Sequence, residues 1–464
     1  MARHTLCALV AGLLACTPLP RVSGVQPAGA VSVGVARIDI TPDEPIRLTG
    51  YGNRTAPAER VKGRLWAKAL AFGEGGQAAV LISADLIGVP REMTEEIAGR
   101  LRSAGLARQQ ITVAATHTHT GPSLTGVLPF IFPEPLAPEQ RAVVDRYSGT
   151  LLDRLEHVAR AALDDRRPST VAWGRGTAGF AANRRVLTGG KWTAFGVDPT
   201  GAVDHDLPVM AVRGLDGTLR AVLASYACHA TTLEGRDNFV HGDWPGVAQA
   251  LIEQRHPGAT AMITIGTGAD ANPDPRGGGL PDVERHARAI AGEVDRVLAS
   301  SLRPVSSGPS GRFRYLDLSF GRTPGEAEWR EQAQRTDAGG LYARAVLEQL
   351  ARGEALARTV PYPVQTWTFG TDLAMVFLGG EVVADYGLRL KRELDGARLW
   401  VHAYSNDVAF YVPSRRMIAE GGYEVDRSMV YYGQPARLAE ETEDQIVNAV
   451  GELLTPAFRR QTGN

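Results

Sequence analysis

Short apolar runs that end in polar loops alternate along this sequence with segments of helical spacing. The runs have the length and the Val, Ile, Leu and Ala content of buried strands, and they occupy residues 78–89, 109–115, 220–227, 259–265 and 373–380. Apolar residues recur at helical spacing in residues 93–105, 143–164, 246–256 and 283–302. We also expect a helix over residues 329–353, in which the pair Gly339 and Gly340 favours a break. This alternation predicts an α/β fold, with one large domain over residues 31–464 and a mixed β-sheet flanked by helices.

The first residues have the pattern of an export signal, which we place over residues 1–30. A short positive region precedes an apolar run from about Leu6 to Ala15, which is too short to span a bilayer. Two cleavage patterns are present: a lipobox that ends in Cys16, and a small-residue site at residues 28–30. The first would leave a lipid anchor on Cys16. We therefore expect an exported protein, periplasmic, secreted or held at the outer surface as a lipoprotein, without a stable transmembrane segment.

Charge and cysteine content argue against nucleic-acid binding and against a disulfide framework. Lys and Arg total 50 against 51 Asp and Glu, so the net charge of -1 gives no field that would attract nucleic acid. The chain has 3 cysteines, and loss of the signal removes Cys7. Cys228 then remains alone or beside a lipidated Cys16, so we expect no disulfide framework and interpret Cys228 as a small buried side chain.

Candidate metal ligands follow several of the apolar runs. His117 and His119 come after the run at residues 109–115, and their i, i+2 spacing places them on one side if the strand continues through them. His229 ends another run, and Glu381 follows a third. Because an α/β fold gathers strand ends at one edge of the sheet, these side chains are candidates for a shared metal site. Glu381 is equally consistent with a carboxylate at the beginning of a helix.

The order of the motifs resembles that of the neutral/alkaline, non-lysosomal ceramidase family. Single motifs are modest, but their ordered set is specific and runs from about residue 32 to the C-terminus. The matching segments are GVARIDITP at 34–42, GYG at 50–52, SADL at 83–86, THTHTGP at 116–122, ANR at 182–184, CHATTL at 228–233, GADANP at 268–273, GE at 380–381, SNDVAFYV at 405–412 and GYE at 422–424.

The resemblance implies a ceramidase-like catalytic domain with one zinc ion per chain. The residues on the family's ligand positions are His117, His229, Glu381 and Tyr411, of which Tyr411 has no signal in its local sequence. His119, Arg184 and Tyr423 fall on positions that contact or orient substrate. Imidazole nitrogens and oxygen donors suit zinc, which activates water at neutral pH.

Two departures from the family pattern bear on the substrate. Asn272 stands where the family's ceramide hydrolases carry a serine, so a serine nucleophile is disfavoured and metal-activated water is the expected attacking group. Asn272 could hydrogen-bond the substrate carbonyl, or it could serve loop geometry alone. The family's C-terminal immunoglobulin-like domain is also not expected here, which weakens the case for ceramide itself.

We therefore expect a zinc-dependent hydrolase that cleaves the amide bond of an N-acylated or lipid-like small molecule, with His119, Arg184, Asn272 and Tyr423 as catalytic residues. An ester or lactone hydrolase of the same superfamily is the nearest alternative, because both reactions need the same oxyanion stabilisation. An amidohydrolase-type barrel is disfavoured by the ordered motifs. The remaining alternative is an exported zinc-containing binding protein without catalytic activity.

Overall fold

The computed structural model describes residue 1 and residues 29–460. A mixed sheet of 9 strands forms its centre, in the order β10-β9-β8-β5-β1-β2-β3-β4, with β12 paired to β5. The pairs β9–β10 and β3–β4 are parallel, and the other pairs are antiparallel. The strands are β1 (Val31–Asp39), β2 (Trp66–Phe72), β3 (Ala79–Ala84), β4 (Ile111–Ala115), β5 (Arg167–Thr177), β8 (Asp206–Gly214), β9 (Leu219–Tyr226), β10 (Thr260–Ile265) and β12 (Arg303–Val305).

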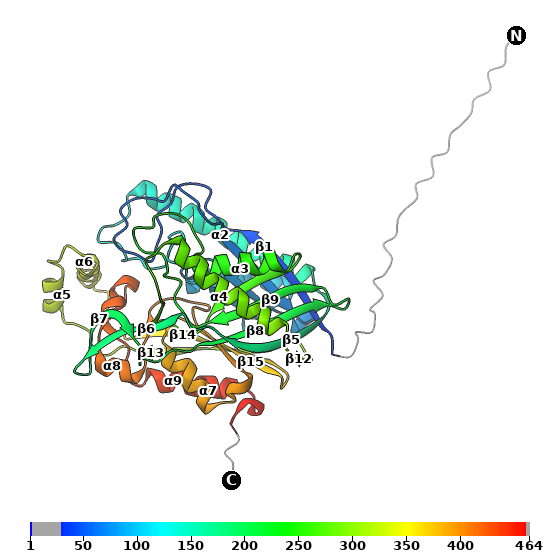
Figure 1. Ribbon diagram of the computed structural model, residues 1–464. Helices are drawn as coiled ribbons and strands as arrows, with labels where there is room; N and C mark the ends of the chain where they lie inside the picture. The colour runs from blue at the N-terminus through cyan, green and yellow to red at the C-terminus, as the bar shows by residue number, and fades with distance from the viewer. Residues whose placement is uncertain (2–28, 461–464) are drawn as a thin grey trace.

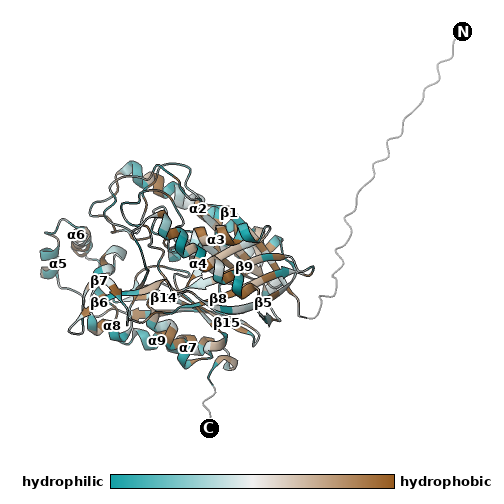
Figure 2. Ribbon diagram, in the orientation of Figure 1, coloured by the Kyte–Doolittle hydropathy of each residue, from teal (hydrophilic) through white to brown (hydrophobic). Residues whose placement is uncertain are grey.

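A second sheet packs against the first and forms a sandwich. It contains β13 (Ser310–Ser319), β14 (Thr359–Phe369), β15 (Leu373–Leu378) and β17 (Leu399–His402). Aromatic pairs join the two sheets: Phe72 meets Phe369 with ring centroids 5.5 Å apart, and Trp173 meets Trp400 at 5.9 Å. The strands β2, β3, β9 and β15 are buried along almost their whole length, and brown, apolar residues mark the strands between the layers in Figure 2.

Helices cover the outer faces of the two sheets (Figure 1). On the 9-stranded side lie α1 (Arg91–Leu101), α2 (Pro138–Asp164), α3 (Asp243–Arg255) and α4 (Leu280–Leu298). α4 buries Val283, Ala287, Ile290 and Val294, which is the i, i+4, i+7 spacing of one helical face. The other side carries α7 (Ala384–Glu393) and α9 (Thr442–Leu453). The predicted α/β fold with a mixed sheet and flanking helices is therefore confirmed.

Two smaller sheets and several short helical elements complete the described chain. They are the sheet β11 (Ala271–Pro273), β6 (Ala181–Thr188) and β7 (Lys191–Asp198), the pair β16 (Glu381–Val382) and β18 (Tyr411–Val412), the helices α5 (Glu326–Gln332), α6 (Ala338–Ala351) and α8 (Arg415–Glu420), the π-helical turn η5 (Tyr423–Arg427), and the 3₁₀ turns η1 (Gly75–Gln77), η2 (Arg102–Ala104), η3 (Arg108–Gln110), η4 (Gly396–Arg398), η6 (Ser428–Tyr432) and η7 (Pro456–Phe458).

The helix expected over residues 329–353 is broken, but not at its glycine pair. The break falls between α5 and α6, where the side chain of Asp337 caps α6 by accepting a hydrogen bond from the Gly340 nitrogen. A Cβ on Gly340 would lie 1.9 Å from the carbonyl oxygen of Arg335. Gly340 is therefore required for close contact at the beginning of α6, and the cap of Asp337 sets the break.

The large sheet curls so that strands near its two ends approach each other. The Ser83 hydroxyl of β3 donates to the Ile263 oxygen of β10 at 2.6 Å, and the buried Lys68 ammonium of β2 donates to the Ala261 oxygen at 2.7 Å. The loops that follow β4, β9 and β10 are thereby gathered into one region. Among the described residues, no helix combines the length and apolar content that a bilayer crossing requires. The predicted export signal and Cys16 lie outside the described residues and stay predictions.

Candidate metal centre

Three loops that follow strands lock together and bring the histidines into contact. Thr118, after β4, forms a parallel bridge with Ala230, after β9. The His229 nitrogen donates to the Ala271 oxygen at 3.0 Å, which ties the loop after β9 to β11. The β4 strand ends at Ala115 and His117 has φ 56, so the strand does not continue through the two histidines as the alternation argument assumed. The left-handed turn at His117 brings the pair together instead, with their Nε2 atoms 3.1 Å apart.

Backbone carbonyls fix the tautomer of all three imidazoles. The Nδ1 atoms of His117, His119 and His229 lie 2.6, 3.1 and 3.1 Å from the carbonyl oxygens of Ile87, Gly50 and Gly268. Each Nδ1 must carry the proton and donate it, which leaves each Nε2 with a lone pair that faces the centre. Burial lowers the pKa of His229 to about 3 and that of His119 well below its ordinary value, so both imidazoles are neutral.

Gly50 allows the backbone to approach the His119 ring closely. It has φ +92, and a Cβ at this position would lie 2.6 Å from the His119 Nδ1. Only glycine permits both the left-handed backbone and the close approach that lets its carbonyl accept from His119. The GYG segment therefore holds the His119 ring from one side, and the Tyr51 ring packs on it with centroids 5.0 Å apart.

Glu381 brings a carboxylate to the same point. Its Oε2 lies 3.1 Å from the Nε2 atoms of both His117 and His229, and among the described residues no donor satisfies this buried oxygen. The Tyr432 hydroxyl donates to the other oxygen, Oε1. Glu381 lies in β16 before α7 begins, so the helix-terminus interpretation does not apply. The Oε2 and the two Nε2 atoms are all hydrogen-bond acceptors, and converging acceptors repel one another unless a cation lies between them. Nitrogen and carboxylate ligands in this arrangement fit a metal ion such as zinc.

Tyr411 reaches the centre because β16 and β18 pair in register, Glu381 opposite Tyr411. Its hydroxyl lies 3.3 Å from the His229 Nε2 and accepts from the Arg184 Nη2 at 3.1 Å. The structure thus brings all four predicted ligands, His117, His229, Glu381 and Tyr411, around one point. The three histidine nitrogens also lie within 4.8 Å of one another, so the geometry admits His119 as a ligand as well.

Arg184 connects this centre to a buried carboxylate. Its Nε donates to the Glu424 Oε1 at 2.9 Å, and its Nη1 donates to the Asn272 Oδ1 at 3.3 Å. The neighbouring Arg185 donates to the Glu424 Oε2. Glu424 is fully buried, as are most atoms of the two arginines. The network holds the guanidinium of Arg184 in a fixed orientation beside Tyr411.

Asn272 presents a free amide donor at the centre. Its Oδ1 accepts from Arg184 at 3.3 Å and from the Thr231 hydroxyl at 3.2 Å. Arg184 can only donate. If the Asn272 amide were flipped, its NH₂ group would face the N–H groups of Arg184 and no hydrogen bond could form. Among the described residues, the Asn272 Nδ2 has no acceptor. The residue retains 8% exposure.

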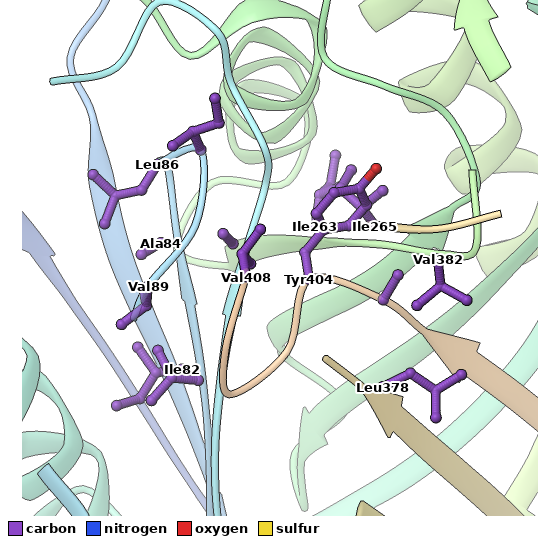
Figure 3. Packing of buried hydrophobic residues seen from close by; sticks show 14 of the residues in the cluster. Ile82, Ala84, Leu86, Val89, Ile263, Ile265, Leu378, Val382, Tyr404 and Val408 are labelled. Carbon is purple, nitrogen blue, oxygen red and sulfur yellow. The ribbon is translucent and has the colours of Figure 1, made fainter. Parts of the chain in front are cut away.

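Aromatic rings enclose the centre. The Tyr404 ring lies 4.1 Å from that of His117, and Figure 3 shows Tyr404 among buried side chains that include Ile263 and Ile265. The rings of Tyr423 and Tyr411 have centroids 5.5 Å apart, and the Arg184 guanidinium carbon lies 5.6 Å from the Tyr423 ring centroid. Phe195 of β7 lies 4.9 Å from Tyr423 and is 48% exposed, so it forms the outer edge of this wall.

Glu424, Tyr432, Thr231 and Phe195 are site residues that the sequence interpretation missed. Glu424 and Thr231 stand in the GYE and CHATTL segments, so the motifs contained them without indicating a role. Tyr432 and Phe195 have no signal in the sequence. Cys228 is buried and has no disulfide partner among the described residues, which agrees with its interpretation as a small core side chain.

The chain is similar to known ceramidases in sequence and in fold. The sequence model of the family described as "Neutral/alkaline non-lysosomal ceramidase, N-terminal" matches residues 31–272. No curated protein sequence matches the chain. The solved structure of a neutral ceramidase from Pseudomonas aeruginosa has a TM-score of 0.69 at 17% identity, over 91% of this chain and 74% of that chain. The solved structure of a ceramidase complexed with C2 has a TM-score of 0.68 at 16% identity, over 93% of this chain and 77% of that chain. At these identities the structures establish a shared fold.

Proposed function

The chain belongs to the neutral/alkaline non-lysosomal ceramidase family, and from this premise we propose that it is a zinc-dependent hydrolase of amide bonds in N-acylated compounds. One observation carries the proposal: the Glu381 Oε2 lies 3.1 Å from two imidazole Nε2 atoms, and no donor among the described residues satisfies it. His117, His229, Glu381 and Tyr411 would hold the ion. A zinc ion in this position supplies Lewis acidity and activates water at neutral pH.

The chain's own residues bind and polarise the substrate. The free Asn272 Nδ2 donates to the carbonyl oxygen of the scissile amide, whose negative charge grows as water attacks. Arg184 keeps Asn272 in this orientation through its Oδ1 and keeps the Tyr411 hydroxyl in place. The Tyr423 hydroxyl is positioned by its ring contacts with Tyr411 and Phe195 to donate to the same oxygen. Burial raises the pKa of Tyr423, so its hydroxyl remains protonated and can donate.

His119 transfers the proton that the reaction requires. It is 9% exposed, whereas His117 and His229 are fully buried, so it is the imidazole on the side from which substrate arrives. Its Nδ1 is held by Gly50, and its Nε2 accepts a proton from the attacking water and passes it to the leaving amine. The carbon–nitrogen bond breaks as the water oxygen joins the carbonyl carbon, which yields a carboxylic acid and an amine.

The side chain of Asn272 determines which group can attack the carbonyl. The amide nitrogen of Asn272 cannot act as a nucleophile, so the attacking group is water and no covalent acyl-serine forms. The same donors would stabilise the oxyanion of an ester, so esters belong in the test.

Metal analysis of the purified protein, paired with a hydrolysis screen, tests the proposal. We expect one zinc per chain and cleavage of short N-acyl amides that a chelator abolishes. The screen includes ceramide and simple esters. His229→Ala should lose most of the zinc while circular dichroism shows a folded protein, and His256→Ala, at the surface beside Asp295, should keep it. Full zinc occupancy in His229→Ala, or chelator-resistant cleavage, would overturn the proposal.

A further inference from the structure

A cavity of about 930 Å³ lies one side chain away from the metal centre, because its lining residue Tyr51 packs on His119. Its walls include Tyr51, Ile131, Arg335, Arg427 and Tyr431. Two of these residues also contact the centre: the Tyr51 ring lies 5.0 Å from that of His119, and the Tyr431 ring lies 6.3 Å from that of Tyr423. The cavity is therefore linked to His119 through the Tyr51 ring and to Tyr423 through the Tyr431 ring.

The exposure of the site residues points to the same side. His117 and His229 are completely buried, whereas His119 and Asn272 retain 9% and 8% exposure. His119 is the residue that donates to the leaving amine, and it packs on Tyr51 at the cavity wall. The amine portion of a substrate would consequently extend into the cavity when its carbonyl lies beside Asn272.

The cavity wall carries a cation that the described residues do not neutralise. Arg335 is paired with Asp337, to which its Nε donates at 3.1 Å. Arg427, also on the wall, has no carboxylate partner among residues 29–460, and its guanidinium carbon lies 4.9 Å from the centre of the Trp192 ring. The indole positions this guanidinium and leaves its N–H groups available to a planar anion. Arg276, which lies outside the cavity lining, donates to the hydroxyl of the lining residue Tyr51 at 3.3 Å.

We propose that the substrate carries a carboxylate on its amine portion, and that Arg427 binds this carboxylate. The substrate class is then N-acyl amino acids, from which hydrolysis releases a fatty acid and a free amino acid. This inference rests on the proposed amide hydrolysis and specifies its substrate. A neutral, two-tailed lipid would offer nothing to pair with Arg427, whereas a carboxylate forms charge-assisted hydrogen bonds with it.

Kinetics with matched substrates test this inference in the zinc-loaded protein. N-octanoylglycine has the carboxylate, N-octanoylethanolamine is neutral, and N-octanoylethylenediamine is cationic. We expect kcat/KM to fall in that order. Arg427→Gln should raise KM for N-octanoylglycine by about tenfold to a hundredfold, which corresponds to the loss of a hydrogen bond to a charged group. The same variant should change KM for N-octanoylethanolamine by less than about twofold, since that substrate has no charge to pair.

Arg335→Gln is the matched control, because it removes an arginine from the same cavity whose charge Asp337 already balances. We expect a smaller increase in KM for N-octanoylglycine than in Arg427→Gln. An equal effect of the two substitutions, an equal effect of Arg427→Gln on the anionic and neutral substrates, or a wild-type preference for the neutral substrate would overturn the inference.

Calorimetric binding separates this inference from the proposed function. N-octanoylglycine is titrated into the chelator-treated wild type and into chelator-treated Arg427→Gln, so that no turnover is involved. Binding that weakens in Arg427→Gln supports the anion site even if the enzyme cleaves none of the three compounds, in which case the proposed hydrolysis alone fails. Binding that is equal in the two proteins overturns the anion site and leaves amide hydrolysis to be judged by the kinetics.

Discussion

Glu424→Gln is the substitution whose effect on stability can be derived most directly from the structure. Glu424 is fully buried and accepts from two buried guanidiniums, those of Arg184 and Arg185. Glutamine can accept from one of them, but its amide group then faces the other as donor against donor. Removing one member of a buried ion pair typically costs 3–5 kcal/mol, roughly, because a buried charge is left without compensation.

The remaining contacts place the expected loss at the lower end of that range. Arg185 keeps the Glu420 Oε2 at 3.0 Å and the Gly421 oxygen at 2.9 Å. Arg184 keeps Asn272 and the Tyr411 hydroxyl. We therefore expect Glu424→Gln to lower the free energy of unfolding by about 3 kcal/mol. Glu420→Gln is the matched control, since its side chain is 10% exposed and pairs with Arg185 and with the half-exposed Arg416 at the edge of the network. Its loss should be smaller than that of Glu424→Gln.

Urea unfolding measures both losses, with zinc and chelator concentrations held fixed because bound metal adds to the stability of the native state. Circular dichroism follows the transition, and equal denaturant slopes for the variants justify comparing their free energies. A loss below about 1 kcal/mol for Glu424→Gln, or a loss no larger than that of Glu420→Gln, would refute the view that Glu424 compensates two buried charges.

Three further substitutions give separate expectations. Asn272→Ala should lower kcat by about tenfold to a thousandfold without reducing zinc content, since it removes an oxyanion donor and no ligand; unchanged kinetics would assign Asn272 to loop geometry alone. Tyr432→Phe should weaken zinc affinity by about tenfold to a hundredfold, because the hydroxyl that orients Glu381 is lost, and competition with a chromogenic chelator measures this. Burial raises the pKa of Asp407 from its ordinary 3.8 to about 7, so the native state retains a proton that the unfolded chain releases between these pH values. The stability that the protonated carboxyl contributes is complete below about pH 4 and is lost as the pH rises to about 7, by up to about 4 kcal/mol. Asp407→Asn should lack this decline, and parallel stability curves for wild type and variant from pH 5 to pH 8 would contradict it.

The sequence was sufficient to predict the fold class and to select candidate residues that lie together in the structure. Apolar runs gave the positions of β3, β4, β9, β10 and β15, and polar residues at their ends gave His117, His119, His229 and Glu381. This succeeded because strand ends meet at a sheet edge whatever the details of the loops. The i, i+2 argument for the histidine pair was wrong in mechanism, since the chain leaves the strand at Ala115 and turns at His117.

Residues whose positions depend on long-range pairing could not be predicted from local pattern. Tyr411 lies beside Glu381 only because two short strands, β16 and β18, pair across a separation of 30 residues in the chain. Phe195 comes from a hairpin whose strand β7 is mostly exposed and therefore has no apolar alternation to detect. The charge of Glu424 is balanced by arginines some 240 residues away. Composition near each residue contains no information on such partners.

Asn272 separates what the fold determines from what the side chain determines. Its backbone position is set by β11, which pairs Asn272 with Ala182 of β6, so any residue at this place would lie beside Arg184 and the metal centre. The reaction depends on the group attached there. A hydroxyl could attack a carbonyl, whereas an amide nitrogen has its lone pair delocalised and can only donate a hydrogen bond. A shared fold is therefore compatible with different substrates, because a metal ion held by the imidazoles and the carboxylate would not constrain residue 272 or the charge on the cavity wall.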